Sequence, residues 1–205
     1  MTLGMILLTA LAVLIFFGTI ERVLDRMYLT DRAALVITAA MFAGTLLPNI
    51  ELGMVSLSIG GALIPLAICV YLLIRADTAL EVWRTILGSI LTAAAVYGLS
   101  MLLPAEAEEL PVDPMLLYAA SGGIIAWLLG RSRRGAFICG ILGVMLADVA
   151  TAVVNWARGI EQQLVLGGAG VADAVVVSGV LAVLLAELVG EITERIVRKR
   201  KEKRI

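Results

Sequence analysis

Histidine is absent from this chain of 205 residues, and only 16% of the residues are charged and 5% aromatic. The absence of histidine removes the usual zinc ligand, the Ser-His triad and the commonest proton shuttle. The two cysteines, Cys69 and Cys139, both lie in apolar runs, which indicates packed small side chains rather than a disulfide framework or a metal pair. We therefore expect no metal, no cofactor and no nucleic-acid partner.

Apolar residues dominate the chain. They make up 61% of it and give a mean hydropathy of +1.02, whereas a soluble domain carries about 25% charged residues. Because backbone amides inside lipid must be hydrogen-bonded within the protein, the fold class predicted is all-α, a polytopic transmembrane helical bundle. About seven spans are predicted, near the usual length of roughly 20 residues. They are Leu3 to Ile20, Ala33 to Leu47, Leu57 to Ile74, Thr85 to Leu103, Met115 to Gly130, Ala136 to Trp156 and Leu166 to Gly190.

The basic residues predict the orientation of these spans, because lysine and arginine are retained on the cytoplasmic side during insertion. With the N-terminus outside and the C-terminus cytoplasmic, every basic residue except Arg158 falls inside. The inner groups are Arg22, Arg26 and Arg32; Arg75 and Arg84; Arg131, Arg133 and Arg134; and the basic residues of the C-terminal tail. We therefore expect a multi-pass protein of the cell (plasma) membrane.

The domain organisation predicted is simple. No Gly/Ser linker, low-complexity tract or soluble domain interrupts the apolar runs, so residues 1–190 are expected to form a single transmembrane helical domain. Residues 191–205 form a basic cytoplasmic tail. The lipid bilayer is the expected partner, and the tail is expected to lie against anionic lipid, at about 1 kcal/mol per lysine or arginine near that surface.

Glycine and proline mark several irregular positions. Turn residues surround short alternating apolar positions from Pro48 to Gly61, which predicts an exterior hairpin, with an irregular loop as an equal alternative. Glycine pairs recur at Gly60-Gly61, Gly122-Gly123 and Gly167-Gly168. Close helix packing is the first interpretation of these pairs, and a faint repeat is the second. Pro65 lies within the predicted third span, where it predicts a kink.

Two aspartates, Asp148 and Asp173, lie inside apolar stretches. A carboxylate in hydrocarbon costs several kcal/mol, so such residues face a protein interior or a water-filled cavity and mark a proton, ion or catalytic site. Asp148 is eight residues before Trp156, and Asp173 is seven after Leu166. These are the expected hairpin ends, so at 1.5 Å per residue the depths are roughly 12 and 10 Å. The sequence predicts that the two carboxyl groups lie at matching depth.

Small and polar residues accompany the aspartates. Thr151 and Asn155 share a helical face with Asp148 and are expected to admit water to the pair. Two carboxylates a few ångströms apart do not readily both ionise, so one can act as general base and the other as general acid for attack of water on an amide. The glycines and alanines expected to support close approach of the two helices are Gly140, Gly143 and Ala147, and Gly167, Gly168, Gly170 and Ala174.

The segment from Gly167 to Gly179 resembles the Gly-x-Gly-Asp element of presenilins, signal peptide peptidases and prepilin or preflagellin peptidases. In those families a second catalytic aspartate lies on the preceding helix, the position that Asp148 would take. The resemblance implies an intramembrane aspartyl protease with Asp148 and Asp173 as catalytic dyad and with transmembrane or signal-peptide helices as substrates. In this chain Gly170 precedes Asp173 by three residues rather than two, and Ala147 stands where tyrosine often precedes the first aspartate.

A second likeness covers nearly the whole chain, which looks like a family of uncharacterised prokaryotic integral membrane proteins, a domain of unknown function found in Firmicutes and archaea. The segments that carry this likeness are 22–26, 59–66, 129–134 and 167–174. It implies the fold and brings no activity with it.

Three functions therefore stay open. The first is the intramembrane protease. The second is a proton- or cation-coupled transporter in which the same carboxylates bind the coupling ion near a glycine-broken helix start. The third is a structural or partner-binding membrane protein in which each aspartate hydrogen-bonds to helix ends or to neighbours such as Thr151 and Asn155.

Overall fold

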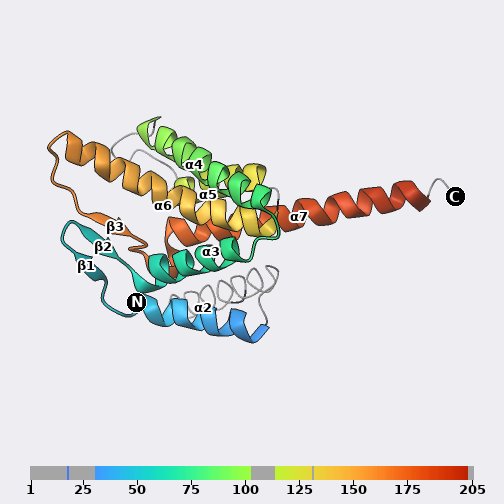
Figure 1. Cartoon of the computed structure of the whole chain (residues 1–205), viewed down its shortest axis with the longest axis horizontal. Coiled ribbons are helices and arrows are strands. Elements are labelled where there is room, and N and C mark those ends of the chain that lie inside the picture. The colour runs from blue at the N-terminus through green and yellow to red at the C-terminus, as the bar shows by residue number, and fades with distance from the viewer. Residues whose placement is uncertain (1–17, 19–30, 103–113, 131, 203–205) are drawn as a thin grey trace, which may run out of the picture.

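The chain was analysed as a computed structural model that describes residues 18, 31–102, 114–130 and 132–202. Apart from Gly18, the predicted span from Leu3 to Ile20 lies outside these residues. The described chain is mostly helical, with one small sheet (Figure 1). Its elements are α2 (Asp31–Thr45), β1 (Ile50–Leu52), β2 (Val55–Leu57), η1 (Ile59–Leu63), α3 (Ile64–Ile74), α4 (Ala79–Leu102), α5 (Pro114–Gly130), α6 (Arg133–Ala157), β3 (Leu164–Leu166), η3 (Gly170–Ala172) and α7 (Ala174–Glu202).

Helix α6 is the centre of the bundle and packs against α4, α5 and α7. Helices α4 and α6 begin at the same end, where Arg134 forms an ion pair with Asp77 and the Ser132 hydroxyl donates to Glu81 at 3.3 Å. The two helices therefore run in the same direction and pack directly against each other, and α5 packs against both. We call this end, which also carries Arg75 and Arg84, the arginine end. Helix α7 continues beyond the bundle (Figure 1).

The three-stranded sheet covers the opposite end of the bundle (Figure 1). Strands β1 and β2 form an antiparallel hairpin, whose turn contains Gly53 at a φ of 65°. Of the two alternatives predicted from the sequence, the hairpin rather than the irregular loop is present; its exterior location stays a prediction. Strand β3 pairs with β2 in parallel, with Leu57 opposite Leu166, and this pairing was not predicted.

Two strand–glycine–helix units lie side by side as a result. One runs from β2 through Gly60-Gly61 into α3, and the other from β3 through Gly167-Gly168 towards α7. A Cβ on Gly61 would lie 2.5 Å from the carbonyl oxygen of Gly170, and a Cβ on Gly60 would lie 2.6 Å from the amide nitrogen of Thr45. Only glycine permits such an approach, so close packing explains the first and third glycine pairs.

The predicted seventh span, Leu166 to Gly190, began too early. Leu166 belongs to β3, and α7 begins at Ala174. Gly167 and Gly170 have φ angles of 69° and 63°, which a right-handed helix does not contain. These glycines contact Gly61 and Thr45 rather than α6. The expected approach of the glycines of 167–170 to α6 is therefore wrong.

The region of Pro65 also differs from a simple kinked span. Residues Ile59–Leu63 form a π-helical turn, and α3 begins at Ile64. Pro65 consequently occupies the first turn of the α-helix, where a missing amide proton costs least. The change of helix type before Pro65 replaces the predicted interior kink.

Helix α4 turns apolar side chains outward and mostly small or hydroxylated ones inward. On α4, Trp83, Leu87 and Leu91 are exposed, whereas Thr85 and Thr92 are buried. Helices that associate in lipid use such small and hydroxylated residues at their interfaces. Among the described residues, α4 and α6 are long and apolar enough to cross a membrane, and α2, η1–α3, α5 and the first part of α7 form shorter apolar helices.

Candidate functional site

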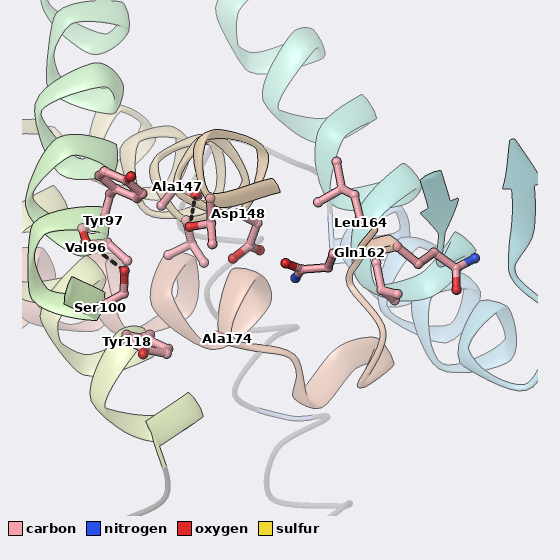
Figure 2. A pocket seen from close by; sticks show the side chains of 13 residues that line it. Val96, Tyr97, Ser100, Tyr118, Ala147, Asp148, Gln162, Leu164 and Ala174 are labelled. Carbon is pink, nitrogen blue, oxygen red and sulfur yellow. Dashed lines mark hydrogen bonds between the residues drawn. The ribbon is translucent and has the colours of Figure 1, made fainter. Parts of the chain in front are cut away.

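A cavity of about 390 Å³ lies between α4, α5, α6 and the start of α7, beside strand β3 (Figure 2). The segment that leads into β3 closes one side of it. The cavity is lined by Val96, Tyr97 and Ser100 of α4, Tyr118 of α5, Val144, Ala147, Asp148 and Thr151 of α6, Gln162 to Val165, and Ala174 of α7. Its wall therefore combines aliphatic surface with hydroxyl, amide and carboxyl groups.

Asp148 contributes the carboxylate of this wall. Its side chain projects from the middle of α6, is partly buried, and points towards the side chain of Gln162 (Figure 2). Among the residues that the structure describes, the Asp148 carboxyl group has no hydrogen bond or ion pair. An acidic group held in an apolar helix without a structural partner is typical of an ion-binding or reactive site.

Asp173 has a different environment, at the start of α7. Its Oδ2 accepts a hydrogen bond from the amide of Ala169 at 3.1 Å, and its Oδ1 accepts one from the amide of Val175 at 3.0 Å. This is the geometry of a helix N-cap, in which a side-chain oxygen satisfies amides that the first turn leaves unpaired. Asp173 itself does not line the cavity, although its neighbour Ala174 does.

The two carboxyl groups nevertheless lie close enough to repel each other when both are ionised. Asp148 lies on α6, Asp173 immediately precedes α7, and its neighbour Ala174 lines the same cavity as Asp148. The structure thus brings together the two residues that the sequence singled out. Their action as a catalytic dyad stays a prediction.

The other predicted site residues separate into two groups. Thr151 lines the cavity, with its hydroxyl donating to the carbonyl of Ala147 at 2.9 Å. Asn155 lies outside the wall and donates to the side-chain oxygen of Gln162, which helps to fix that residue. The predicted supporting glycines Gly167, Gly168 and Gly170 are not in the wall.

Several wall residues were missed by the sequence reasoning. Tyr97, Ser100 and Tyr118 come from helices that carried no acidic signal, and Gln162 and Gln163 lie on the return segment after α6. The indole nitrogen of Trp156 donates to the carbonyl of Gln162 at 2.7 Å, and this bond folds the return segment over the cavity. The hydroxyl residues of α4 repeat at helical spacing, which is the signal that would have identified this helix as a wall.

The cysteines are free and buried, as their apolar surroundings predicted. Among the described residues, no group of three or more histidine, cysteine, aspartate or glutamate side chains is placed to hold a metal ion. The ionisable chemistry of the cavity wall therefore rests on Asp148 and the two tyrosines.

Fold and site together define a helical-bundle protein with a partly open, carboxylate-bearing cavity. The chain belongs to the DUF1614 family, described as a protein of unknown function, whose model matches residues 8–185. The match includes both Asp148 and Asp173. Neither a curated protein nor a solved structure matches the chain.

Proposed function

We propose that this chain is a multi-pass membrane protein that binds a proton or small cation at Asp148 and carries it across the membrane. The observation that carries the proposal is the Asp148 carboxyl group. It faces a cavity of about 390 Å³ and has no hydrogen bond or ion pair within the described part of the chain. Such a group is costly in an apolar helix and is retained where an ion binds it.

The membrane arrangement proposed has about seven spans, the N-terminus outside and the basic tail in the cytoplasm. The lengths of α4 and α6 and their exposed apolar side chains support membrane crossing by these two helices. The arginine end would face the cytoplasm, and the sheet would face the exterior. Under this arrangement the cavity lies towards the outer leaflet, and the tail lies against anionic lipid of the inner leaflet.

Irregular backbone before α7, whose first residue borders the cavity, supports transport. Transporters place their ion and substrate sites where helices are discontinuous, because unwound segments expose backbone groups and permit local movement. Here η1 precedes α3 as a π-helical turn, and α7 is preceded by β3, a glycine turn and η3. Ala174, the first residue of α7, is part of the cavity wall.

An intramembrane aspartyl protease is the second candidate, and the electrostatic contact of Asp148 with Asp173 favours it. In that mechanism one carboxylate takes a proton from water as the oxygen attacks the peptide carbonyl, and the other carboxyl group supplies a proton to the departing amine. Both oxygens of Asp173 already accept backbone amides. Because the Asp173 carboxylate is used to cap α7, an ion site that needs only Asp148 is the better supported function.

The test compares Asp148→Asn with Asp173→Asn in the full-length protein. Asparagine retains an N-cap oxygen at position 173, so this variant should keep the fold. Each protein is reconstituted into vesicles that contain a pH-sensitive dye, a pH gradient is imposed, and proton entry is recorded. We expect Asp148→Asn to lower the rate by about a hundredfold, the scale of a lost proton-transferring group, and Asp173→Asn to retain it.

A parallel assay follows cleavage of model transmembrane and signal-peptide helices. Cleavage abolished by both substitutions would establish the protease and overturn transport. Proton and sodium entry that are both equal with and without protein, together with no cleavage, would contradict both functions and leave a structural role. Sodium entry that depends on Asp148, in the absence of proton entry, would assign a metal cation as the transported ion.

A further inference from the structure

Two fully buried hydroxyl groups next to the cavity have no hydrogen-bond partner. Thr92 and Ser178 are each 0% exposed, and Thr92 Oγ1 and Ser178 Oγ are unpaired within the described chain. Buried Thr38 and Ser89, by contrast, donate to the carbonyl four residues earlier, at 2.8 and 2.9 Å. Since buried polar groups are almost always paired, these two exceptions indicate a function beyond packing.

Both hydroxyl groups lie one helical turn from the cavity, on the side of the arginine end. Thr92 is one turn before Val96 on α4, and Ser178 is one turn after Ala174 on α7; Val96 and Ala174 both line the cavity. A Cβ at Gly122 would lie 2.7 Å from Ser178 Oγ and 2.9 Å from Val144, which also lines the cavity. The two unpaired hydroxyl groups therefore lie just behind the part of the cavity wall formed by Val96, Val144 and Ala174.

Glycines bring the helices together at this level. A Cβ at Gly143 of α6 would lie 2.5 Å from the Thr92 methyl group, and a Cβ at Gly140 would lie 2.8 Å from the Cα of Gly179, next to Ser178. The hydroxyl groups thus approach α6 from α4 and from α7. No larger side chain on α6 separates them at these two positions.

The face of α4 that carries Thr92 remains polar as far as the arginine end. Ser89, Thr85 and Glu81 follow at spacings of three and four residues, which places them on one side of the helix. Ser89 and Cys139 both donate to the carbonyl of Thr85, at 2.9 and 3.4 Å. From Ser100 in the cavity to Glu81 the helix rises roughly 28 Å, close to the thickness of a bilayer core of about 30 Å.

We infer that Thr92 and Ser178 form the first step of a proton path from the Asp148 cavity along this face of α4 to the arginine end. The inference rests on the proposed function and adds its route. In each transfer a hydroxyl oxygen accepts one proton and releases its own to the next oxygen, so the group is unchanged after the proton has passed. The hydroxyl groups of Thr92 and Ser178 have no acceptor within the described chain and are free to reorient as this requires, whereas Ser89 must first release its bond to the carbonyl of Thr85.

Close packing is the competing explanation, and it predicts a different response. If the two residues serve only to let helices approach, the hydroxyl of Thr92 is dispensable and Thr92→Val, which keeps the shape of the side chain, leaves transport intact. If they relay protons, Thr92→Val blocks transport, and Thr92→Ser, which keeps the hydroxyl, does not.

The test uses the full-length protein in dye-loaded vesicles of phosphatidylcholine and phosphatidylglycerol under a pH gradient. The variants are Thr92→Val, Ser178→Ala, the combination of both, and Thr92→Ser. Thr38→Val is the matched control, because Thr38 is equally buried but lies on α2 and is paired with its own helix. We expect the combined variant to lower proton entry by about tenfold or more, and Thr92→Ser and Thr38→Val to stay near wild type. Thermal unfolding in detergent verifies the fold of each variant.

The possible results distinguish failure of the proposed proton path from failure of the proposed transport function. Wild-type entry rates in the combined variant, with loss in Asp148→Asn, would overturn the path and leave the function standing. Loss in the combined variant with retention in Asp148→Asn would support the path and overturn the role of Asp148. No entry through the wild-type protein would overturn both. Should the combined variant fail to fold, Thr92→Val alone decides by the same criterion.

Discussion

Gly61, in the turn before α3, and Gly167, in the turn after β3, are in backbone contact. A Cβ on Gly167 would lie 2.5 Å from the amide nitrogen of Ala62, and its φ of 69° is itself a conformation that favours glycine. The contact fixes the starts of two helices against each other next to the wall of the cavity. Disrupting the contact between Gly61 and Gly167 should therefore change both the stability of the protein and the shape of the cavity.

Gly61→Ala should destabilise the protein, because the added methyl group would overlap the backbone of Gly167 and Gly170. We expect a loss of about 1–3 kcal/mol, the cost of overpacking a close contact, measured by thermal unfolding in detergent. Gly98→Ala is the control, since a Cβ there meets nothing within 4 Å. That change should be neutral or stabilise α4 by up to about 1 kcal/mol. Equal melting of both variants would argue against the contact.

Asp173→Ala should lower the free energy of unfolding by about 1–2 kcal/mol, because α7 loses its N-cap. Asp173→Asn should lose much less, since an amide oxygen can accept one of the same backbone amides. Chemical or thermal unfolding of both variants in one detergent measures the difference. A large and equal loss in both variants would show that the negative charge, rather than the cap, is required.

Asp148→Leu should make the protein more stable while it abolishes proton entry. The carboxyl group is partly buried and has no partner in the described chain, so an apolar replacement removes a desolvation cost. A gain of about 1 kcal/mol is expected, as is common where a functional site is replaced. Asp77→Ala is the contrast: it removes the exposed ion pair with Arg134 and should cost under about 1 kcal/mol. A marked loss of stability in Asp148→Leu would indicate a structural role.

The proposed orientation predicts which end of the bundle is reached from outside the cell. Glu161→Cys at the sheet end and Arg133→Cys at the arginine end both replace exposed side chains. The native cysteines are buried, which keeps background labelling low. In intact cells a membrane-impermeant maleimide should label position 161, and position 133 only after permeabilisation. The reverse pattern would invert the topology.

Helices were the part of the fold that the sequence predicted best. The runs assigned to the second, fourth, fifth and sixth spans correspond to α2, α4, α5 and α6. A long apolar stretch bounded by charged residues is predicted well because a helix satisfies its backbone hydrogen bonds internally. The start of α7 was misplaced because Gly167 to Ala172 are apolar and carry no charge to mark the boundary. Hydropathy carries no information about backbone φ. The positive φ angles of Gly167 and Gly170 are what keep this segment out of the helix.

The sequence predicted the acidic residues of the candidate site but not most of the other residues that line the cavity. Asp148 and Asp173 were conspicuous because carboxylates are rare in apolar runs, whereas Tyr97 and Gln162 are ordinary residues that matter only through their position. The N-cap role of Asp173 could not be recognised while that residue was thought to lie inside a helix. Parallel pairing of β2 with β3 joins segments far apart in sequence, which no local pattern encodes.

The pairing of β2 with β3 affects the order in which the fold assembles during synthesis. The hairpin of β1 and β2 leaves the ribosome long before β3, so the outer edge of β2 lacks its permanent neighbour while α3 to α6 are synthesised. An open strand edge invites association with other chains. Completion of the sheet must wait until β3 has emerged, which makes the pairing of β3 with β2 a late step of assembly.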